Sequence, residues 1–161
     1  MATVTVKNVD RLTQRLKRIA DMDLRDKMVE ATKLVHAQAK ALAPVGDTGN
    51  LAGSIRMEVN NKAGNMEGRV YTNLEYAPYV EFGTGIKGNG SYPYKIENVS
   101  LSYRDSGWVY TPDGGETFFY TKGQIAQPYM YPALKQNEKY IKQLFKTGVK
   151  EKLKDSCKGG Q

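Results

Sequence analysis

The stretch from Tyr76 to Gly85 constrains the fold more than any other part of the sequence. It reads Tyr-Ala-Pro-Tyr-Val-Glu-Phe-Gly-Thr-Gly, and its spacing puts apolar groups on one side of a two-turn helix. Pro78 suits the first turn of such a helix, and Gly83 can end it in a left-handed conformation. A short apolar helix must dock on something larger. If Glu81 is buried there, it needs a cation or backbone N–H groups nearby.

Hydrophobic periodicity predicts what lies before this helix. Apolar residues at helical spacing predict a long helix from Leu24 to Leu42, stopped by Pro44. Alternating apolar residues predict two strands, 54–59 and 69–74, which pair as an antiparallel hairpin around a polar loop. A further helix is expected over residues 8–20, after a short strand containing Val4 and Val6.

The second half of the chain predicts a loop, a hairpin and a helix. Residues 86–105 are rich in Gly, Ser, Tyr and Asn and are interpreted as a loop insertion. Trp108–Tyr110 and Thr117–Tyr120 flank a strong turn signal, and a last helix is expected from about Ala133 to Lys154. The pattern predicts a single α+β domain over residues 1–161. Its antiparallel sheet of hairpins carries the long N-terminal helix and the C-terminal helix on one face, with a flexible basic tail at 150–161.

Composition bounds the compartment and the chemistry. The 161 residues are 40% hydrophobic, enough for one real core. No apolar run is long enough to cross a bilayer, and Met1–Asp10 lacks the apolar stretch of a signal peptide, so a cytoplasmic location is expected. The one cysteine, Cys157, excludes an internal disulfide and a zinc site made of thiolates.

The net charge of +7 sits in the two flanks of the sequence. On the last predicted helix, five lysines fall within about 80° of one another beside an apolar face. They are Lys135, Lys139, Lys142, Lys146 and Lys150. This lysine stripe has two interpretations: a solvated helix face, or a contact with DNA phosphates or an acidic protein. The 11 tyrosines include several in predicted loops, which suits a protein–protein interface. The candidate interface residues are Tyr92, Tyr94, Tyr103 and Tyr129.

No pattern in the sequence specifies an enzyme, and no catalytic residue, metal site or cofactor is expected. Gly83–Gly88 matches the G-x-G-x-x-G fingerprint of nucleotide sites, but that motif needs a strand before it and a helix after it. Here a helix precedes it, so a flexible hinge is the favoured interpretation. The one histidine, His36, lies off the apolar stripe of its helix, which predicts a partly exposed surface role.

Three motifs together resemble a family of tailed-phage proteins, the gene-product-ten-like family. They are Ala43–Leu51 (Ala-Pro-Val-Gly-Asp-Thr-Gly-Asn-Leu, with Ser54-Ile55 after it), Tyr76–Gly85, and Ala126–Leu134 (Ala-Gln-Pro-Tyr-Met-Tyr-Pro-Ala-Leu). The resemblance covers roughly Asp23 to Phe145, and the insertion at 86–105 is its least typical part.

The resemblance implies a tail-completion or head–tail joining protein without enzymatic activity. Such proteins form a ring, expected to hold six subunits, between the neck and the tail tube, and DNA leaves through its lumen. The implied partners are further copies of the chain, a neck or head-closure protein, a tail-tube or tail-terminator protein, and transiently the genomic DNA. The implied location is the head–tail junction of the virion, with host cytoplasm during assembly.

The motif residues are then structural. They are Pro44, Gly46, Asp47, Thr48, Gly49, Leu51, Tyr76, Tyr79, Val80, Glu81, Phe82, Gly83, Thr84, Gly85, Pro128 and Pro132. The alternatives are a DNA-binding module that uses the lysine stripe and a phosphate-dependent enzyme that uses Gly83–Gly88.

Overall fold

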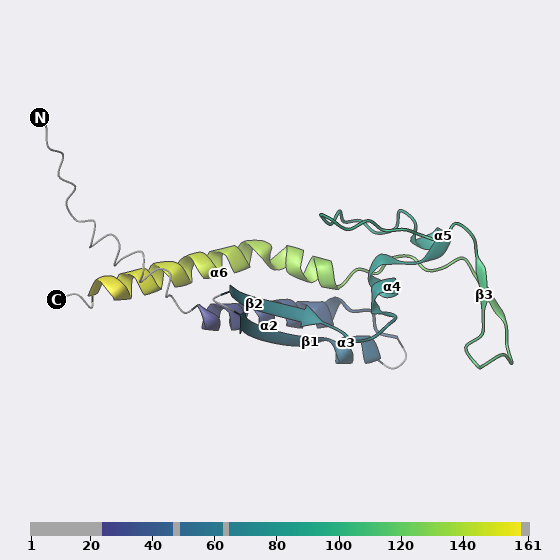
Figure 1. The fold of residues 1–161 in the computed structure, drawn as a ribbon, viewed down its shortest axis with the longest axis horizontal. Coiled ribbons are helices and arrows are strands. Elements are labelled where there is room, and N and C mark those ends of the chain that lie inside the picture. Colours follow the sequence, from purple (N-terminus) through teal and green to yellow (C-terminus); the bar gives the residue numbers. More distant parts are fainter. Residues whose placement is uncertain (1–23, 47–48, 63–64, 159–161) are drawn as a thin grey trace, which may run out of the picture.

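The chain folds into a helix-on-sheet body with a projecting hairpin. The computed structural model describes residues 24–46, 49–62 and 65–158 (Figure 1). Its elements in chain order are α2 (Arg25–Leu42), α3 (Asn50–Ser54), β1 (Arg56–Lys62), β2 (Asn65–Tyr71), α4 (Ala77–Phe82), α5 (Gly85–Gly88), β3 (Trp108–Tyr110), β4 (Phe119–Thr121) and α6 (Met130–Lys158). The predicted α+β class is confirmed. The expected strand at Val4 and Val6 and the helix over 8–20 lie outside the described residues.

Helix α2 is the spine of the body, and its sequence explains both its ends. Leu24 precedes it in a non-helical conformation, and Asp26 places a negative charge in the first turn, where the helix dipole favours one. At the other end the N–H of Ala43 bonds to the carbonyl of Ala39, after which Ala43 turns extended because Pro44 follows. The predicted long helix is confirmed to within one residue.

Strands β1 and β2 form an antiparallel hairpin in which Met57 pairs with Val70 and Val59 with Gly68. These four residues alternate with polar ones, so they share one face of the hairpin. Gly68 lies against α2: a Cβ there would fall 2.1 Å from Oγ1 of Thr32. The other face carries charge, since Arg69 Nη1 lies 3.1 Å from Glu58 Oε1 and its guanidinium lies over Tyr71.

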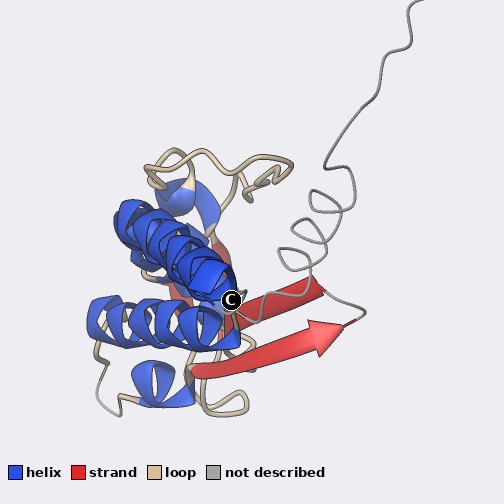
Figure 2. Ribbon diagram, turned by 90° about the vertical axis from the view of Figure 1, so that its left-hand side faces the viewer, coloured by secondary structure: helices blue, strands red, loops and turns tan. Residues whose placement is uncertain are grey.

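Helix α6 packs on α2, and both lie on one side of the β1–β2 hairpin (Figure 2). The contact uses small residues: Ala133 is fully buried, and a Cβ on Gly148 would fall 2.9 Å from Cγ of Lys27. Helix α6 is longer than predicted at both ends, and it continues through Gly148 because that glycine is the point of close approach to α2.

The core lies where α2, α3, α4 and the start of α6 meet. Its buried members are Ala39, Ala43, Leu51, Ile55, Ala77, Tyr129 and Ala133. Three differences from the predicted elements matter. The strands of the first hairpin run further into the expected loop, α3 was not anticipated, and β3–β4 forms a second two-stranded sheet separate from the first.

Candidate assembly interface

A buried carboxylate holds α4 against the start of α6. Glu81 is 5% exposed, and its oxygens accept the backbone N–H groups of the three residues Tyr129, Met130 and Tyr131 at 2.7, 2.9 and 3.1 Å. These N–H groups belong to the first turn of a helix, where they have no partner within the helix and where the dipole favours negative charge. The predicted requirement of a buried Glu81 for backbone N–H groups is therefore met.

The carboxylate of Glu81 and its three N–H partners are here called the clamp. Aromatic rings surround it. Burial, followed by the charge of Glu81 and the neighbouring Tyr76, raises the pKa of Tyr129 to about 12. Burial and Glu81 also raise the pKa of Tyr92, whose hydroxyl has no hydrogen-bond partner among the described residues. A run of edge-to-face and tilted ring contacts, with centroids 5.0 to 5.7 Å apart, joins Phe82, Tyr92, Tyr94 and Tyr131.

The glycine motif forms a backbone crossing with residues 122–126. Thr84 and Gln124 exchange backbone hydrogen bonds of 2.9 and 3.1 Å, and the N–H of Lys87 donates to the carbonyl of Lys122. A Cβ on Gly123 would lie 1.9 Å from the carbonyl oxygen of Thr84, and one on Gly83 would lie 2.7 Å from the amide nitrogen of Ala126. The glycines therefore allow close backbone packing. This differs from the flexible hinge that was predicted from the sequence.

The Pro44–Leu51 motif turns the chain from α2 into the sheet. Gly49 has a φ of 61° and directly precedes α3, whose Leu51 is buried in the core. Asp47 and Thr48 lie outside the described residues. His36 on α2 is half-buried, and its Nε2 donates a 3.0 Å hydrogen bond to the carbonyl of Ile55. In the structure, the described residues of this motif and His36 make contacts within the fold.

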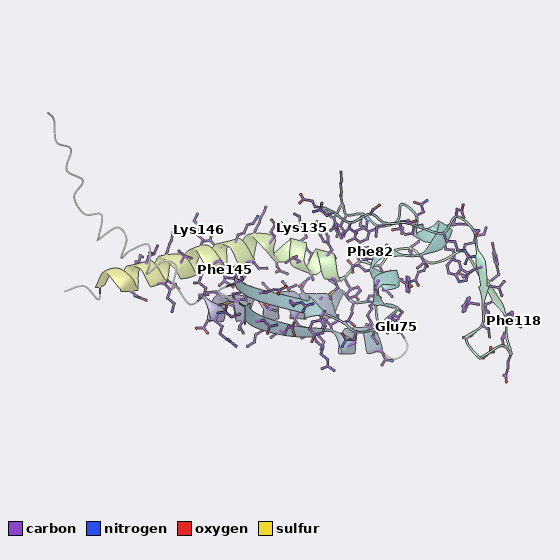
Figure 3. The ribbon with its side chains drawn as sticks, in the orientation of Figure 1. Glu75, Phe82, Phe118, Lys135, Phe145 and Lys146 are labelled. Atoms are coloured by element: carbon purple, nitrogen blue, oxygen red, sulfur yellow. The ribbon has the colours of Figure 1, made fainter. Side chains whose placement is uncertain are left out.

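The β3–β4 hairpin, residues 108–121, is here called the arm. It extends from the crossing, away from the C-terminal end of α6, and Phe118 lies on it at the far end of the molecule (Figures 1 and 3). Large apolar side chains on the arm face solvent: Val109 is 59%, Phe118 70% and Tyr120 65% exposed. Tyr110 and Phe119 stack at 5.8 Å and are also exposed. A run of exposed rings of this kind is typical of a binding surface.

An apolar groove of about 790 Å³ opens between α2, β2 and α6. Its α6 wall is made by Leu134, Ile141 and Phe145, and Phe145 points toward the body in Figure 3. Met28 and Val70 contribute from α2 and β2. Leu134 is 52% exposed because it faces this open groove.

The predicted interface tyrosines divide between surface and interior. Tyr92 and Tyr94 are half-buried in the ring contacts above, and Tyr103 donates a 2.9 Å hydrogen bond to the carbonyl of Phe82. Tyr129 is 1% exposed, so its ring is out of reach of a neighbouring molecule in this conformation. The structure does not bring the four together on one surface.

The exposed surface of the arm was not predicted from the sequence. The signal was present in Phe118-Phe119-Tyr120, three aromatic residues in succession. Since neighbouring side chains on a strand point to opposite faces, such a run cannot bury all its rings against one body.

The lysine stripe is exposed along its whole length. Lys135 and Lys146 point away from α2 in Figure 3. Both Lys135 and Lys142 pair with Glu138 at 2.8 and 2.5 Å, and the two lysines lower the pKa of that carboxyl to about 2. Within the described residues, the other three stripe lysines form no ion pair.

Two further findings concern chemistry and membranes. Within residues 24–46, 49–62 and 65–158, no three His, Cys, Asp or Glu side chains are grouped so that they could hold a metal ion. None of the helices in that part of the chain combines the length and the apolar character needed to cross a bilayer.

These features define a small α+β scaffold with three distinctive parts: an exposed apolar arm, an apolar groove and a basic helix. The resemblance inferred from the motifs is confirmed, because residues 6–83 match the model of the HK97-gp10-like family, described as "Bacteriophage HK97-gp10, putative tail-component". The match covers the first two motifs up to Gly83 and ends before the third. No match was found among curated proteins or among solved structures. The family supports a structural role in a phage tail and a place in the virion.

Proposed function

We propose that this protein is a non-enzymatic virion component that joins the tail tube to the head or neck. The observation that carries the proposal is the family match over residues 6–83, which names a tail component. Several copies would form a ring, six being the number that the family resemblance implies, and genomic DNA would pass through its lumen. The neighbours would be a neck or head-closure protein on one side and a tail-tube or tail-terminator protein on the other.

The surfaces of the molecule support work by association. The large exposed apolar side chains are concentrated on the arm, and the groove offers an apolar surface on the body. Interfaces between proteins are rich in aromatic residues, and five of the 14 residues of the arm are aromatic. Tyr92, Tyr94 and Tyr103 remain proposed contacts, because they line the loop beside the clamp.

The test is a phage or prophage in which the gene is deleted and then supplied in trans with a small tag. Electron microscopy of the deletion should show filled heads and separate tails, and the supplied protein should restore joined particles. Labelling of the tag should mark the junction. Normal joined particles in the deletion, or a tag found only at the distal end of the tail, would contradict the proposal.

A second candidate is DNA binding by the lysine stripe. The specific observation is that all five lysines are exposed on one side of α6. If they contact phosphates, binding of duplex DNA should weaken steeply with salt. Replacing Lys139, Lys146 and Lys150 by glutamine should lower the slope of log K against log salt by about 3 × 0.9. No measurable binding at 50 mM salt, or an unchanged slope, would dismiss this candidate.

A further inference from the structure

The arm presents apolar surface that its own molecule does not cover. Phe118 is 70% exposed and Val109 is 59% exposed. Figure 1 places both strands of the arm beyond α4 and α5, on the side away from the groove's α6 wall. Exposed apolar surface of this kind needs a partner to leave water.

The root of the arm fixes the direction in which it points. The reciprocal hydrogen bonds of Thr84 and Gln124 hold the two sides of the crossing together, and the side chain of Gln124 donates to the carbonyl of Tyr79 on α4 at 2.8 Å. Trp108 packs on Gly85, whose Cβ would lie 2.7 Å from Cζ3 of that ring. An arm anchored in this way cannot fold back into the groove of its own chain without breaking these bonds.

The groove and the arm have opposite charge around their apolar surfaces. The arm, residues 108–121, contains Asp113 and Glu116 and neither Lys nor Arg. Helix α6, which forms one wall of the groove, contains eight Lys against Glu138, Glu151 and Asp155. Charge complementarity of this kind orients an association and excludes like-charged pairings.

We propose that the arm of one copy docks into the groove of a second copy of this chain, its rings against Leu134, Ile141 and Phe145 and its acidic turn near the lysine stripe. This inference rests on the proposed function and deepens it by naming the contact that builds the ring. Arm and groove are different surfaces, so the contact is head-to-tail, and repeating it through a closing rotation generates a ring.

The turn of the arm is built to hold its shape while it binds. Asp113 accepts hydrogen bonds from the hydroxyl of Thr111 at 2.8 Å and from the N–H of Thr117 at 2.9 Å, and these bonds hold its pKa well below the usual range. Glu116 lies in the same turn and forms no hydrogen bond or ion pair with the described residues, so it is the residue to change when the charge is tested.

Disulfide trapping tests the contact. The variant carries Phe118→Cys on the arm and Leu134→Cys in the groove, with Cys157→Ser to remove the native thiol. Oxidation of the concentrated protein should give a ladder of dimers, trimers and larger species, because each chain offers one surface of each kind. Each single cysteine should stop at dimers. The matched control is Val45→Cys with Leu134→Cys, since Val45 is an 82% exposed apolar residue that belongs to neither the arm nor the groove, and it should give no ladder.

Charge reversal provides the second measurement and needs no cysteine. Glu116→Lys should weaken self-association, measured by light scattering over a concentration series, by about tenfold, and Lys139→Glu with Lys146→Glu should do the same. Combining both sets of changes in one chain should restore most of the self-association. Absence of the ladder, or a combined variant that associates no better than either parent, overturns the inference.

The two proposals fail separately. If the tagged protein marks the head–tail junction but no ladder forms, the arm contact is wrong and the joining function stands. If the ladder forms but the protein is absent from virions, the contact stands and the joining function is wrong.

Discussion

At the scale of single residues, Glu81 links two parts of the chain that are about 50 positions apart in sequence. A carboxylate usually caps a helix from the residue just before it, whereas here it arrives from another helix. Because α6 begins at Met130 with no acidic residue in its own first turn, the charge that its N-terminus favours comes from α4. The N-terminus of α6 therefore depends on the packing of α4 against it.

Removing this carboxylate should be costly. Glu81→Ala should lower the free energy of unfolding by about 3 kcal/mol, since it leaves three N–H groups without an acceptor in a buried place. Glu81→Gln keeps one oxygen and the shape but loses the charge, and should lower it by about 1 to 2 kcal/mol. Chemical denaturation followed by circular dichroism measures both.

Glu75 provides the control, because it is exposed and lies just before α4 (Figure 3). Glu75→Ala should change the free energy of unfolding by no more than about 0.5 kcal/mol. An equal loss for the two alanine variants would mean that the loss at position 81 is general and owes nothing to the clamp.

Tyr129 should make the fold sensitive to alkali. Its pKa is raised from 10.0 to about 12 by burial and by Glu81, so the folded state holds the phenolic proton more tightly than the unfolded state. The stabilisation is complete below pH 10 and is lost as the pH rises toward 12. We expect unfolding free energies that are level from pH 7 to 9 and fall above 10, on the order of 2 kcal/mol from this group.

Comparing two phenylalanine variants isolates the cause. Tyr129→Phe should reduce the fall above pH 10, whereas Tyr120→Phe, on the exposed arm, should leave it unchanged. An identical pH profile for Tyr129→Phe and the unaltered protein would show that this hydroxyl does not control the alkaline transition.

At the scale of elements, the crossing of residues 83–88 with 122–126 shows why a motif alone is a weak guide. Its glycine spacing is that of a phosphate-binding loop, yet a helix precedes it and backbone fills the space above it. Gly123, outside the motif, approaches Thr84 most closely of these glycines. The sequence gives no sign of that approach, because the two segments are nearly 40 residues apart.

Gly123→Ala tests the crossing. The added Cβ would collide with the carbonyl of Thr84 at 1.9 Å and would also sit at a φ of 91°. We expect a loss of about 3 kcal/mol in the stability of this region, seen as faster hydrogen exchange at the amides of Thr84 and Gln124.

Gly90→Ala is the matched variant, because Gly90 also has a positive φ, of 72°, but has open space around it. It should cost about 1 kcal/mol through backbone strain alone. If the two variants behave alike, the close approach at the crossing contributes nothing beyond the φ value.

Local sequence patterns predicted the elements that have strong hydrophobic periodicity. They did not predict the elements whose position depends on tertiary contacts. Helix α2 and both hairpins follow from spacing and turn chemistry. Helix α3 was not predicted, because Gly49-Asn50-Leu51 is typical of a turn when the packing of Leu51 is unknown. The side of α6 that packs on α2 was not predicted either. It uses Ala133 and Gly148, and small residues do not stand out in a hydrophobic pattern.

At the scale of the whole molecule, the arm and the body differ in how they are held. The body has a shared core of buried residues, whereas the arm is two three-residue strands with most of their side chains in water. A two-stranded hairpin of that size has little stability of its own. Its exposed surface was not anticipated from the loop tyrosines, because exposure depends on which segments the fold leaves uncovered.

Excision of the arm should separate folding from assembly. Replacing residues 109–120 by Gly-Gly-Ser-Gly removes mostly exposed side chains, so the midpoint of thermal unfolding should move by less than about 3 °C. The same variant should fail to restore joined particles in the deletion phage. A drop of about 10 °C or more would show that the arm supports the body, and full restoration would show that assembly does not need it.

Helix α4 has two sets of attachments, and together they decide where a pull on the arm is felt. Tyr79 and Val80 accept hydrogen bonds from Gln124 and Gln127 on the return strand from the arm, while Glu81 grips the start of α6. Tension applied at the arm therefore reaches the start of α6, a helix of 29 residues, by two routes: directly along residues 122–129 of the chain and through these hydrogen bonds of α4. In the joining role proposed above, this arrangement would spread a pull on the arm over two helices, α4 and α6.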